Sequence, residues 1–494
     1  MISTYIHDID MYTFIENSWG GVTTTNHRHF KANNEYLNEF NPDEPTSFIH
    51  YIDANNLYGA SMCQKMPTGN FRWLNQSDIE QMDVTKMDAD GDTCYILECE
   101  LEYPTSLHDY HNDYPLAVEG KLITEDQLSP YNKEFLKNHK ERFKATRKLC
   151  PDLHDKHSYV CSLKNLQFFL QRGIKLKKIH RVLAADQSNF LKPYIDFNSA
   201  KRQHSKSKFE QDFFKLANNS IYGKFIESLR NRTNVDIVKD TTAAKRLTSK
   251  PQYLGFHILD DNITIVQSIK RTITLNKPIA CGFIVLENSK IIMGDFWYGV
   301  MKPRYGDQIK LLLSDTDSFV YAVYTADGYK DLYDLREYMD LSDYREDTCI
   351  GQFHDSTNKK IPGKFSDEKP KEIIEEVIAL KPKMYSILTK KLVCEKAEEH
   401  EKFPNHVCVK NCFTGHKAIA KGIPEASKKS ISHEDYRKVL ELKNTTMTTA
   451  RTIRSFNNKL YSIAIQKRGL SAYDDKKYIL ADGVNTLSYG HYLI

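Results

Sequence analysis

An acidic residue follows a short apolar run near the start of the chain. Residues 47–52 (Ser-Phe-Ile-His-Tyr-Ile) predict a β-strand that ends at Asp53, and a turn-forming Ala-Asn-Asn segment follows at once. A carboxylate in this position can point into a cleft at the end of a sheet. A capped turn without any chemical role is the alternative.

Two further acids lie together in a predicted hairpin. The β-rich runs 309–313 and 319–324 are joined by a polar segment that contains Asp315 and Asp317. Side chains two positions apart in extended backbone share a face, so both carboxylates could reach one site. Clustered carboxylates repel one another unless a cation neutralises them, and Mg²⁺ prefers oxygen ligands. Together with Asp53 the pair indicates a metal site, against the alternative of a solvated hairpin tip.

A third segment could offer a cation, an amide and an aromatic ring on one helix face. At about 100° per residue, Lys215, Asn219 and Tyr222 fall within one narrow stripe of a predicted helix. A second stripe, which we expect to pack against the protein, is apolar and consists of Phe209, Phe213 and Leu216. An ordinary amphipathic helix with its polar face in water is the alternative.

The elements that must position these residues combine strands and helices. Residues 188–228 predict two helices separated by a polar turn at 204–207, and residues 94–103 alternate as a strand with one wet face. Further helices are predicted near 130–148 and 162–172. After about residue 430 the pattern is helical and mixed.

The bulk composition is that of a soluble globular protein. The chain has 494 residues, 40% apolar and 27% charged, with a net charge of only +4. Ten cysteines without framework spacing suggest reduced thiols, with Cys150 and Cys161 structural. No signal peptide and no apolar run long enough to cross a membrane is visible. We expect a soluble protein of the host nucleus or cytoplasm that is not secreted and does not bind a membrane.

The charge is unevenly distributed. The segment from Asp78 to Asp126 is acidic, whereas basic residues greatly outnumber acids between Lys137 and Arg181. A surface that meets polyanions and a solvated basic face are both compatible with this pattern. The cations that could contact a polyanion or a protein partner on such a surface are Lys175, Lys177, Lys178 and Arg181.

Together and in this order, the three segments resemble motifs A, B and C of the family B DNA polymerases. Motif A appears as D-A-N-N-L-Y-G from Asp53, motif B as K-L-A-N-N-S-I-Y-G from Lys215, and motif C as L-S-D-T-D-S from Leu313. A fourth segment, Lys381-Pro-Lys383-Met-Tyr385, is similar to the K-x-Y motif of the family. The form of motif A resembles the protein-primed branch, in particular Polinton-like eukaryotic and viral members.

Segments outside these motifs extend the resemblance over nearly the whole chain. Gly20 and Gly21, with Arg28 and the pair at 33–34, resemble the Y-x-G-G linker region. Leu101-Glu-Tyr-Pro, Lys421-Gly-Ile and the tail from Ser488 are also similar to family segments.

The resemblance implies a role for each matched residue. Asp53 and Asp317 would be the principal metal ligands, with Asp315 beside them as a third catalytic acid. Tyr58 would be a steric gate against ribonucleotides. The residues expected to bind the incoming nucleotide are Tyr58, Arg202, Lys215, Asn219, Tyr222 and Gly223. The residues expected to bind DNA are Gly20, Gly21, Lys383 and Tyr385.

The resemblance also implies the fold and the division of the chain. We expect an α+β, right-hand polymerase fold with an antiparallel palm sheet, helical fingers and a C-terminal thumb. The expected ranges are 1–45 for a linker remnant, 46–187 for the first palm part with a region like that which contacts a terminal protein, 188–228 for the fingers, 229–425 for the second palm part and 426–494 for the thumb.

The implied function is template-directed DNA synthesis in the replication of a viral or mobile element. Two Mg²⁺ ions, replaceable by Mn²⁺, would be the cofactors, and primer-template DNA and dNTPs the partners of a monomeric enzyme. The sequence leaves open whether a terminal protein supplies the primer. A pseudopolymerase that only binds DNA is the rival interpretation. A sugar-nucleotide transferase that uses Asp315 and Asp317 would leave motif B and the K-x-Y segment unexplained.

Several features depart from the family pattern. Asn56 and Gly59 replace Ser and Pro in motif A, Leu313 replaces Tyr in motif C, and Gln211 stands where relatives carry Lys. The chain begins almost at the linker, so we expect no 3′–5′ exonuclease and no proofreading in this polypeptide. Four residues, His406, Cys408, Cys412 and His416, could bind zinc, although their spacing fits no standard finger.

Overall fold

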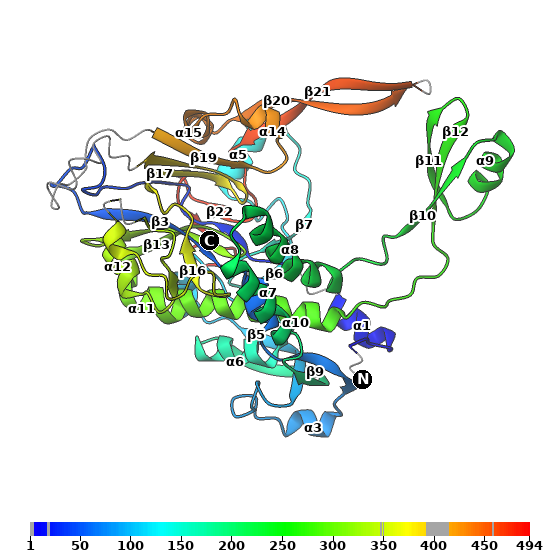
Figure 1. The fold of residues 1–494 in the computed structure, drawn as a ribbon, viewed down its shortest axis with the longest axis horizontal. Helices are drawn as coiled ribbons and strands as arrows, with labels where there is room; N and C mark the ends of the chain where they lie inside the picture. The colour runs from blue at the N-terminus through cyan, green and yellow to red at the C-terminus, as the bar shows by residue number, and fades with distance from the viewer. Residues whose placement is uncertain (1–3, 17–19, 346–347, 349, 392–413, 457–458) are drawn as a thin grey trace.

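The computed structural model describes residues 4–16, 20–345, 348, 350–391, 414–456 and 459–494. Its body combines helices with mostly antiparallel sheets, as the α+β prediction requires. Two projections leave this body, an arm built from residues 233–269 and a long β-ribbon built from residues 445–471 (Figure 1).

The central sheet brings together segments that are distant in the sequence. Its strand order is β1-β13-β14-β3-β16-β15, so the predicted hairpin β13–β14 lies beside β3. Both β3 and β14 are buried almost throughout, which explains their nearly continuous apolar sequences. The strands of this sheet are β1 (Thr23–Thr25), β3 (Ser47–Ala54), β13 (Ile309–Asp315), β14 (Ser318–Tyr324), β15 (Met339–Asp340) and β16 (Phe365–Asp367).

A second antiparallel sheet carries the K-x-Y segment. Its order is β19-β18-β17-β2, and helix α15 (His433–Glu441) packs on β17 and β18. The strands are β2 (His29–Lys31), β17 (Glu372–Lys381), β18 (Met384–Lys391) and β19 (Thr414–Ala420).

A third sheet, in the order β4-β9-β5-β8, is built from residues 66–188. In β5 the glutamates are half-buried and the residues that alternate with them from Cys99 onward are buried, so the predicted alternation is confirmed. A two-stranded ribbon, β6 (Glu119–Leu122) with β7 (Arg147–Cys150), lies in the same segment of the chain. The strands of the sheet are β4 (Met66–Trp73), β5 (Thr93–Glu102), β8 (Lys156–Ser162) and β9 (Lys175–Ser188).

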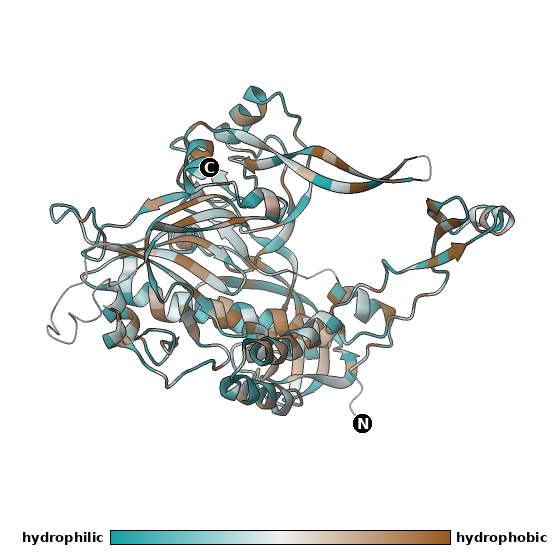
Figure 2. Cartoon of the chain, turned by 45° about the horizontal axis from the view of Figure 1, so that its top comes forward, coloured by the Kyte–Doolittle hydropathy of each residue, from teal (hydrophilic) through white to brown (hydrophobic). Residues whose placement is uncertain are grey.

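Helix α10 (Ile279–Asp295) contributes many residues to the hydrophobic core. It is buried along nearly its whole length and continues into a π-helical turn, η2 (Phe296–Met301), whose Trp297 is fully buried. Hydrophobic residues gather in this helix and in the central sheets, whereas the projections carry mixed colours (Figure 2). The body therefore has the continuous core that the two projections lack.

Two antiparallel helices, α7 (Lys192–His204) and α8 (Lys208–Phe225), occupy the range in which we predicted the fingers. A capping box, in which Ser207 and Glu210 bond each other's backbone, starts α8 directly after the polar turn. The buried amide of Asn198 donates to Asn218 Oδ1 at 3.0 Å, so a polar contact joins the two helices.

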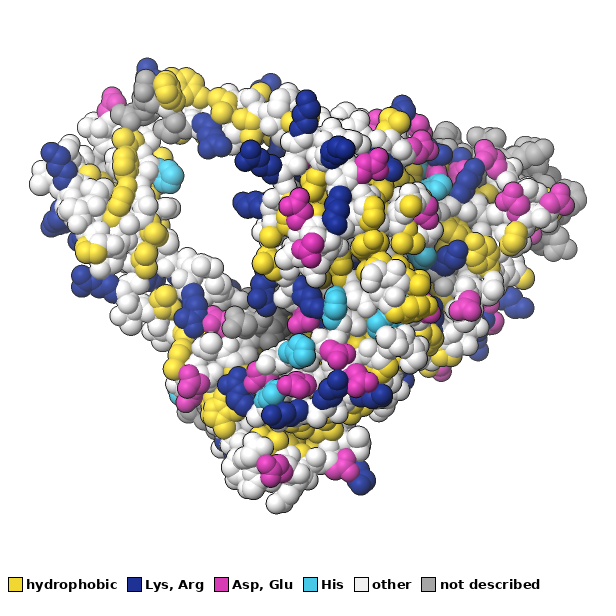
Figure 3. All heavy atoms as spheres, turned by 180° about the vertical axis from the view of Figure 1, so that it is seen from behind, with side chains coloured by type: hydrophobic (Ala, Val, Ile, Leu, Met, Phe, Trp, Pro, Cys, Tyr) yellow, Lys and Arg dark blue, Asp and Glu magenta, His cyan; other side chains and the backbone are white. Residues whose placement is uncertain are grey.

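The arm and the β-ribbon approach each other at their outer ends. The arm is a three-stranded sheet, β10 (Thr233–Val238), β12 (Ile263–Ile269) and β11 (Tyr253–Asp260), with helix α9 (Thr241–Thr248). Strand β11 lies beside β20 (Thr445–Phe456) and β21 (Lys459–Ser471) of the ribbon. Arm, ribbon and body consequently surround an open hole, bordered by Lys and Arg side chains (Figure 3).

Three predictions about elements are wrong. The helix expected over 130–148 ends at Asn138, where α5 (Pro130–Asn138) stops, and residues 147–150 form β7. The C-terminal part is dominated by the β-ribbon rather than by helices. The stripe of Phe209, Phe213 and Leu216 does not pack, because α8 stands away from the body on that side and leaves these side chains 80%, 56% and 65% exposed.

The remaining helices and strands are short. None of the helices in the described part of the chain is long and apolar enough to cross a membrane. These elements are α1 (Ile9–Glu16), α2 (Leu57–Met62), α3 (Gln76–Glu80), η1 (Thr105–Leu107), α4 (His108–His111), α6 (Leu163–Gln171), α11 (Lys302–Tyr305), η3 (Gly306–Gln308), α12 (Gly328–Asp334), η4 (Gly351–Phe353), α14 (Glu425–Lys428), β22 (Tyr478–Ile479) and β23 (Thr486–Leu487).

Candidate active site

The three motif acids meet at one end of the central sheet. Strands β3 and β14 pair so that Asp53 lies opposite Ser318, directly after Asp317. The backbone N–H of Ala54 donates to the Asp317 carbonyl at 2.7 Å, and Asp317 N–H donates to the Asp315 carbonyl at 2.8 Å. The segments that carry these acids are thus joined by backbone hydrogen bonds, although more than 250 residues separate Asp53 from Asp315.

The electrostatics of this corner favour a cation. Burial raises the pKa of the Asp53 carboxyl, and the negative charges of Asp317 and Glu368 raise it further. Burial likewise raises the pKa of Asp317, helped by the Asp315 carboxylate. Ionisation of these neighbouring, buried carboxyl groups therefore costs electrostatic free energy, and a bound divalent cation would lower that cost.

The donor set suits Mg²⁺ that is shared with a substrate. Asp315 forms an ion pair with Lys383, and Lys383 Nζ lies 2.6 Å from Asp315 Oδ1. Among the described residues no three acidic, histidine or cysteine side chains form a complete metal-binding group. Mg²⁺ commonly uses one or two carboxylates and completes its shell with water and phosphate oxygens. Asp53 and Asp317 fit this pattern.

A glycine allows the N-terminal segment to pass the hairpin tip. A Cβ atom on Gly21 would lie 2.6 Å from Cγ2 of Thr316, which is closer than real contacts allow. The N–H of Thr316 donates to the Val22 carbonyl at 2.8 Å, and Thr316 itself has a left-handed φ of 68°. Gly21 is therefore next to the acids, and Gly20 directly precedes it.

Two cations of the helical pair face the acids across a cavity. The cavity has a volume of about 270 Å³, and its lining includes Asp53, Arg202 and Lys215. The charge of Lys215 partly offsets the upward pKa shifts of Asp53 and Asp317, so it lies within electrostatic range of both. This arrangement suits an anionic substrate whose reacting end lies at the acids.

Two tyrosine rings pack against each other near the acids. Tyr58, in α2, and Tyr222, in α8, have ring centroids 4.2 Å apart at an interplanar angle of 31°. Burial raises the pKa of Tyr58, and the Asp317 carboxylate raises it further, so the ring lies near the acids. Asn219 is half-buried and Gly223 is exposed on the same helix, and a Cβ atom on Gly223 would meet only open space.

The departures in motif A have a structural reason. Asn56 precedes α2 with a left-handed φ of 44°, a conformation that asparagine tolerates better than most residues. A Cβ on Gly59 would lie 2.1 Å from Nδ2 of Asn56, so only glycine leaves room for this side chain. The Asn56 and Gly59 substitutions therefore form a matched pair.

The K-x-Y segment adjoins the acids from the second sheet. Lys383 has a left-handed φ of 62° in the turn between β17 and β18. The hydroxyl of Tyr385 lies 3.3 Å from that of Tyr51 in β3, and burial raises the pKa of Tyr385 to about 12. Both side chains are thus close to the end of β3 that carries Asp53.

Several residues of the site had no signal in the sequence. Glu368 follows β16 and lines the cavity, and Lys417 of β19 lies over the Tyr51 ring at 4.4 Å and 3.4 Å from Glu368. Lys360 and Asp343 also line the cavity. Glu368, Lys360 and Asp343 come from irregular segments, where neither periodicity nor a motif distinguishes them from solvated charges.

The basic segment is largely neutralised within the protein. Lys175 pairs with Glu102 at 3.1 Å and Arg181 with Glu98 at 2.7 Å across the third sheet. Lys177 lies 3.4 Å from both Glu102 and Asp155. The solvated-face interpretation therefore accounts for most of this charge, and a template or priming-protein contact stays a prediction.

The proposed zinc ligands mostly lie outside the described residues. His406, Cys408 and Cys412 lie outside the described residues. Of the four, the structure describes His416 alone, in β19, with its Nε2 3.3 Å from the Ile431 carbonyl oxygen. Cys150 and Cys161 are both buried, as expected for structural thiols.

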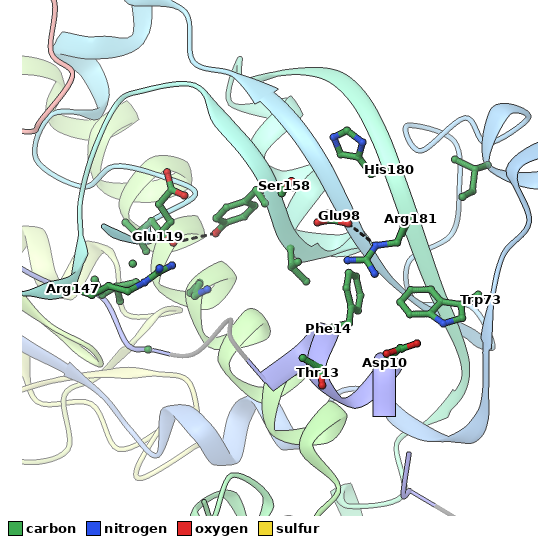
Figure 4. A pocket seen from close by; sticks show the side chains of 18 of the residues that line it. Asp10, Thr13, Phe14, Trp73, Glu98, Glu119, Arg147, Ser158, His180 and Arg181 are labelled. Carbon is green, nitrogen blue, oxygen red and sulfur yellow. Dashed lines mark hydrogen bonds and ion pairs between the residues drawn. The ribbon is translucent and has the colours of Figure 1, made fainter. Parts of the chain in front are cut away.

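A larger cavity, of about 950 Å³, is lined by residues of the third sheet, of strands β6 and β7 and of helix α1 (Figure 4). None of the motif acids lines it. Its Arg181 is already bound, stacked over Phe14 and Trp73 at 4.9 and 5.4 Å and paired with Glu98. Size alone does not make this cavity the better candidate.

Comparisons with known proteins bear on the family and the fold of the chain. A family model described as DNA polymerase type B, organellar and viral, matches residues 37–297, more than half of the chain. No curated protein sequence gives a significant match.

Solved structures of Phi29 DNA polymerase are similar to this chain. The complex with primer-template DNA and incoming nucleotide matches at 13% identity with a TM-score of 0.51, covering 94% of this chain and 63% of that one. An orthorhombic crystal form gives 12% identity and a TM-score of 0.52, covering 93% and 63%. At this identity the likeness shows the fold alone, and it confirms the predicted polymerase fold. The chain spans only 63% of the length of these structures.

Proposed function

The chain belongs to the organellar and viral type B DNA polymerase family, and from this premise we propose that it is a DNA-directed DNA polymerase. It adds dNTPs to a primer 3′-hydroxyl under the direction of a template strand. The observation that carries the proposal is the meeting of Asp53 with Asp315 and Asp317 beside a cavity that two cations line.

Asp53 and Asp317 hold the cofactor in this proposal. Two Mg²⁺ ions, or Mn²⁺ in their place, would activate the primer hydroxyl and stabilise the departing pyrophosphate. Asp315 stays paired with Lys383 and keeps that cation beside the acids. The raised pKa values of Asp53 and Asp317 support a cation site, since they reflect carboxyl groups that are buried beside other negative charges.

The remaining motif residues bind and select the substrates. Lys215 and Arg202 neutralise the triphosphate, and Tyr58 excludes a ribose 2′-hydroxyl. Tyr222, Asn219 and Gly223 shape the pocket for the nascent base pair. DNA contacts are assigned to the following residues: Lys383 and Tyr385 at the primer end, Gly20 and Gly21 along the strand beside the hairpin tip.

We assign the domains in the same way. Residues 188–228 are the fingers, 46–187 and 229–425 the palm with its insertions, 426–494 the thumb and 1–45 a linker. The family's organellar and viral members support replication of a viral or mobile element as the context. Action as a monomer, priming by a terminal protein and the lack of proofreading stay predictions.

Primer extension by the purified chain tests the proposal. With Mg²⁺ or Mn²⁺ we expect template-directed products from the wild type and none from Asp317→Ala, because the main metal ligand is lost, while both proteins bind primer-template DNA alike. Asp307→Ala, on a solvent-facing turn before β13, serves as the control and should extend normally. DNA binding without extension by the wild type would instead identify a pseudopolymerase.

A further inference from the structure

A palm-side lysine lines the same cavity as the two cations of the fingers. Lys360 belongs to the loop between η4 and β16, and it borders the cavity together with Arg202, Lys215 and Asp53. No family motif assigns a role to this loop. Three cations from two sides of the molecule thus surround one space that ends at a catalytic acid.

The loop is fixed rigidly to the motif A segment. Asn55 donates its backbone N–H to the Lys364 carbonyl at 2.8 Å and accepts from Gly363 N–H at 2.7 Å. The buried carboxylate of Asp340 accepts from both Asn55 Nδ2 and the backbone N–H of Lys360, each at 2.8 Å. Lys360 is therefore placed relative to Asp53 by hydrogen bonds, with little freedom in its backbone.

The backbone of Lys360 is itself unusual. Its φ is 54°, in the left-handed region that non-glycine residues rarely adopt. Such conformations persist when the surrounding bonds impose them, and they cluster at functional sites. The fingers also reach this loop, because Gln203 of α7 donates to the Lys359 carbonyl at 2.8 Å.

The nearest partner of the Lys360 side chain is a replaceable one. Its Nζ lies 2.6 Å from Oδ2 of Asp343, whose side chain is 48% exposed, and 3.9 Å from Oδ2 of the buried Asp340. Ion pairs with an exposed partner contribute little, and a polyphosphate offers more negative charge than one carboxylate. Arg202 has no ion-pair partner among the described residues, yet it also lies in the field of Asp343.

We propose that Lys360 binds the β- and γ-phosphates of the incoming nucleotide and the pyrophosphate that leaves, with Asp343 as the counter-anion it returns to between turnovers. The proposal rests on the proposed polymerase function. During transfer the primer 3′-oxygen bonds the α-phosphorus, and the bond from that phosphorus to the bridging oxygen breaks. Pyrophosphate departs with the electron pair, and the hydroxyl proton passes to water. Lys360 touches only the leaving group.

Two substitutions distinguish this proposal from an ion pair that is merely structural, by the direction in which each changes KM. If Lys360 and Asp343 only brace the loop, Lys360→Ala and Asp343→Asn remove the same contact and act alike. If Lys360 binds phosphate and Asp343 competes for it, the two substitutions act in opposite directions. Lys360→Arg retains the cation, and Lys359→Ala, an exposed neighbour, is the matched control.

The experiment measures KM for a single dNTP addition and for pyrophosphate in the reverse reaction, together with the Kd for primer-template DNA. We expect Lys360→Ala to raise both KM values by about tenfold, as for loss of a charge-assisted hydrogen bond. Lys360→Arg and Lys359→Ala should stay near the wild type, and Asp343→Asn should lower both values. DNA affinity should not change. Unchanged KM values in Lys360→Ala, or a parallel rise in Asp343→Asn, would overturn the proposal.

A binding measurement covers the case in which the wild type extends no primer, which would refute the polymerase function itself. The Kd of a dNTP is then measured with Mg²⁺ and a dideoxy-terminated primer-template. Weaker dNTP binding by Lys360→Ala than by the wild type would still support the phosphate contact, and equal affinity would refute it.

Discussion

At the scale of single residues, the surroundings of the Tyr58 ring bear directly on the choice of substrate. It lies against Tyr222 with centroids 4.2 Å apart, and the folded-over Asn56 side chain fills the space beside Gly59 at the start of the same helix. A ring that packs against Tyr222 in this way, and is partly buried, has few rotamers available. It is suited to exclude a substituent by shape.

Removal of the Tyr58 ring should weaken discrimination against ribonucleotides. We predict that Tyr58→Ala incorporates ribonucleotides at least about tenfold more readily relative to deoxyribonucleotides, because the lost contact is steric and no other described side chain replaces it. Tyr58→Phe, which keeps the ring, is the control and should discriminate like the wild type. Competition between the two nucleotides in single-turnover extension measures the ratio, and an unaltered ratio in Tyr58→Ala would discard the gate role.

Sequence patterns could identify the motif residues but not those that complete the site. Asp53 stands at a predicted strand end and Asp315 and Asp317 share a face by their spacing, whereas the family resemblance alone joined the two segments. Lys360 and Glu368 reach the cavity through irregular loops that Asn55 and β16 hold in place. Their positions depend on tertiary hydrogen bonds, for which a single sequence carries no local signal.

At the scale of elements, sequence periodicity predicted where helices form better than it predicted which of their faces are buried. The boundaries of α7 and α8 follow the predicted turn, since Ser207 caps α8. The apolar stripe of α8 is nevertheless solvent-exposed, because the hairpin of helices touches the body through its other face and its base. The β-ribbon of residues 445–471 was missed, because its strands are largely exposed and carry apolar and polar residues without a buried face.

One buried carboxylate joins helix α15 to the second sheet, in addition to the apolar contacts between them. Glu376 of β17 lies 2.6 Å from His29 Nε2 and 3.1 Å from His433 Nε2, and it also pairs with Arg437. Burial alone would raise the pKa of Glu376, but the hydrogen bonds from His29 and His433 and the Arg437 charge lower it to about 2 from 4.5. The ionised form is therefore stabilised in the folded protein.

The sign of the pH dependence follows from this depressed pKa. Since the folded-state pKa lies below the unfolded one, the stabilisation is complete above about pH 4.5 and is lost as the pH falls towards 2. We predict that Glu376→Gln destabilises the protein by about 2 kcal/mol at pH 7. The difference from the wild type should narrow below pH 4.5.

Thermal unfolding of both proteins between pH 7 and pH 3 measures this difference. Glu441→Gln, at an exposed position of the same helix, is the control and should melt like the wild type throughout. A gap between Glu376→Gln and the wild type that widened on acidification would contradict the assigned role of the carboxylate.

At the scale of the whole molecule, the arm and the ribbon turn an open body into a ring. Both projections are largely exposed and have little core of their own, so folding stability does not explain them. Exposed Arg451, Arg454, Lys459 and Lys467 lie along the ribbon, and Lys and Arg border the hole in Figure 3. A ring whose ribbon side is positively charged suits a polyanion that passes through it.

Deletion of the arm should shorten the products of each binding event. We predict that replacement of residues 233–269 by a short Gly-Ser linker leaves single-nucleotide addition near the wild-type rate, because the acids and the fingers are untouched. Extension in the presence of a DNA trap should stop severalfold earlier, because the ring is open. Substitution of Lys245 and Arg246 by Ser, on exposed positions of α9, changes arm charge without opening the ring and serves as the control. Long products from the armless protein would refute this role.

The central claim is that Asp53 and Asp317 hold divalent cations at the end of the central sheet. Mn²⁺ binding, followed by electron paramagnetic resonance in a complex with dideoxy-terminated primer-template and the matching dNTP, tests it most directly. Relative to DNA and dNTP alone, the wild type should hold two Mn²⁺ ions tightly, and Asp317→Asn should hold fewer. A wild-type complex without bound Mn²⁺, or an Asp317→Asn complex that binds it equally well, would contradict the account.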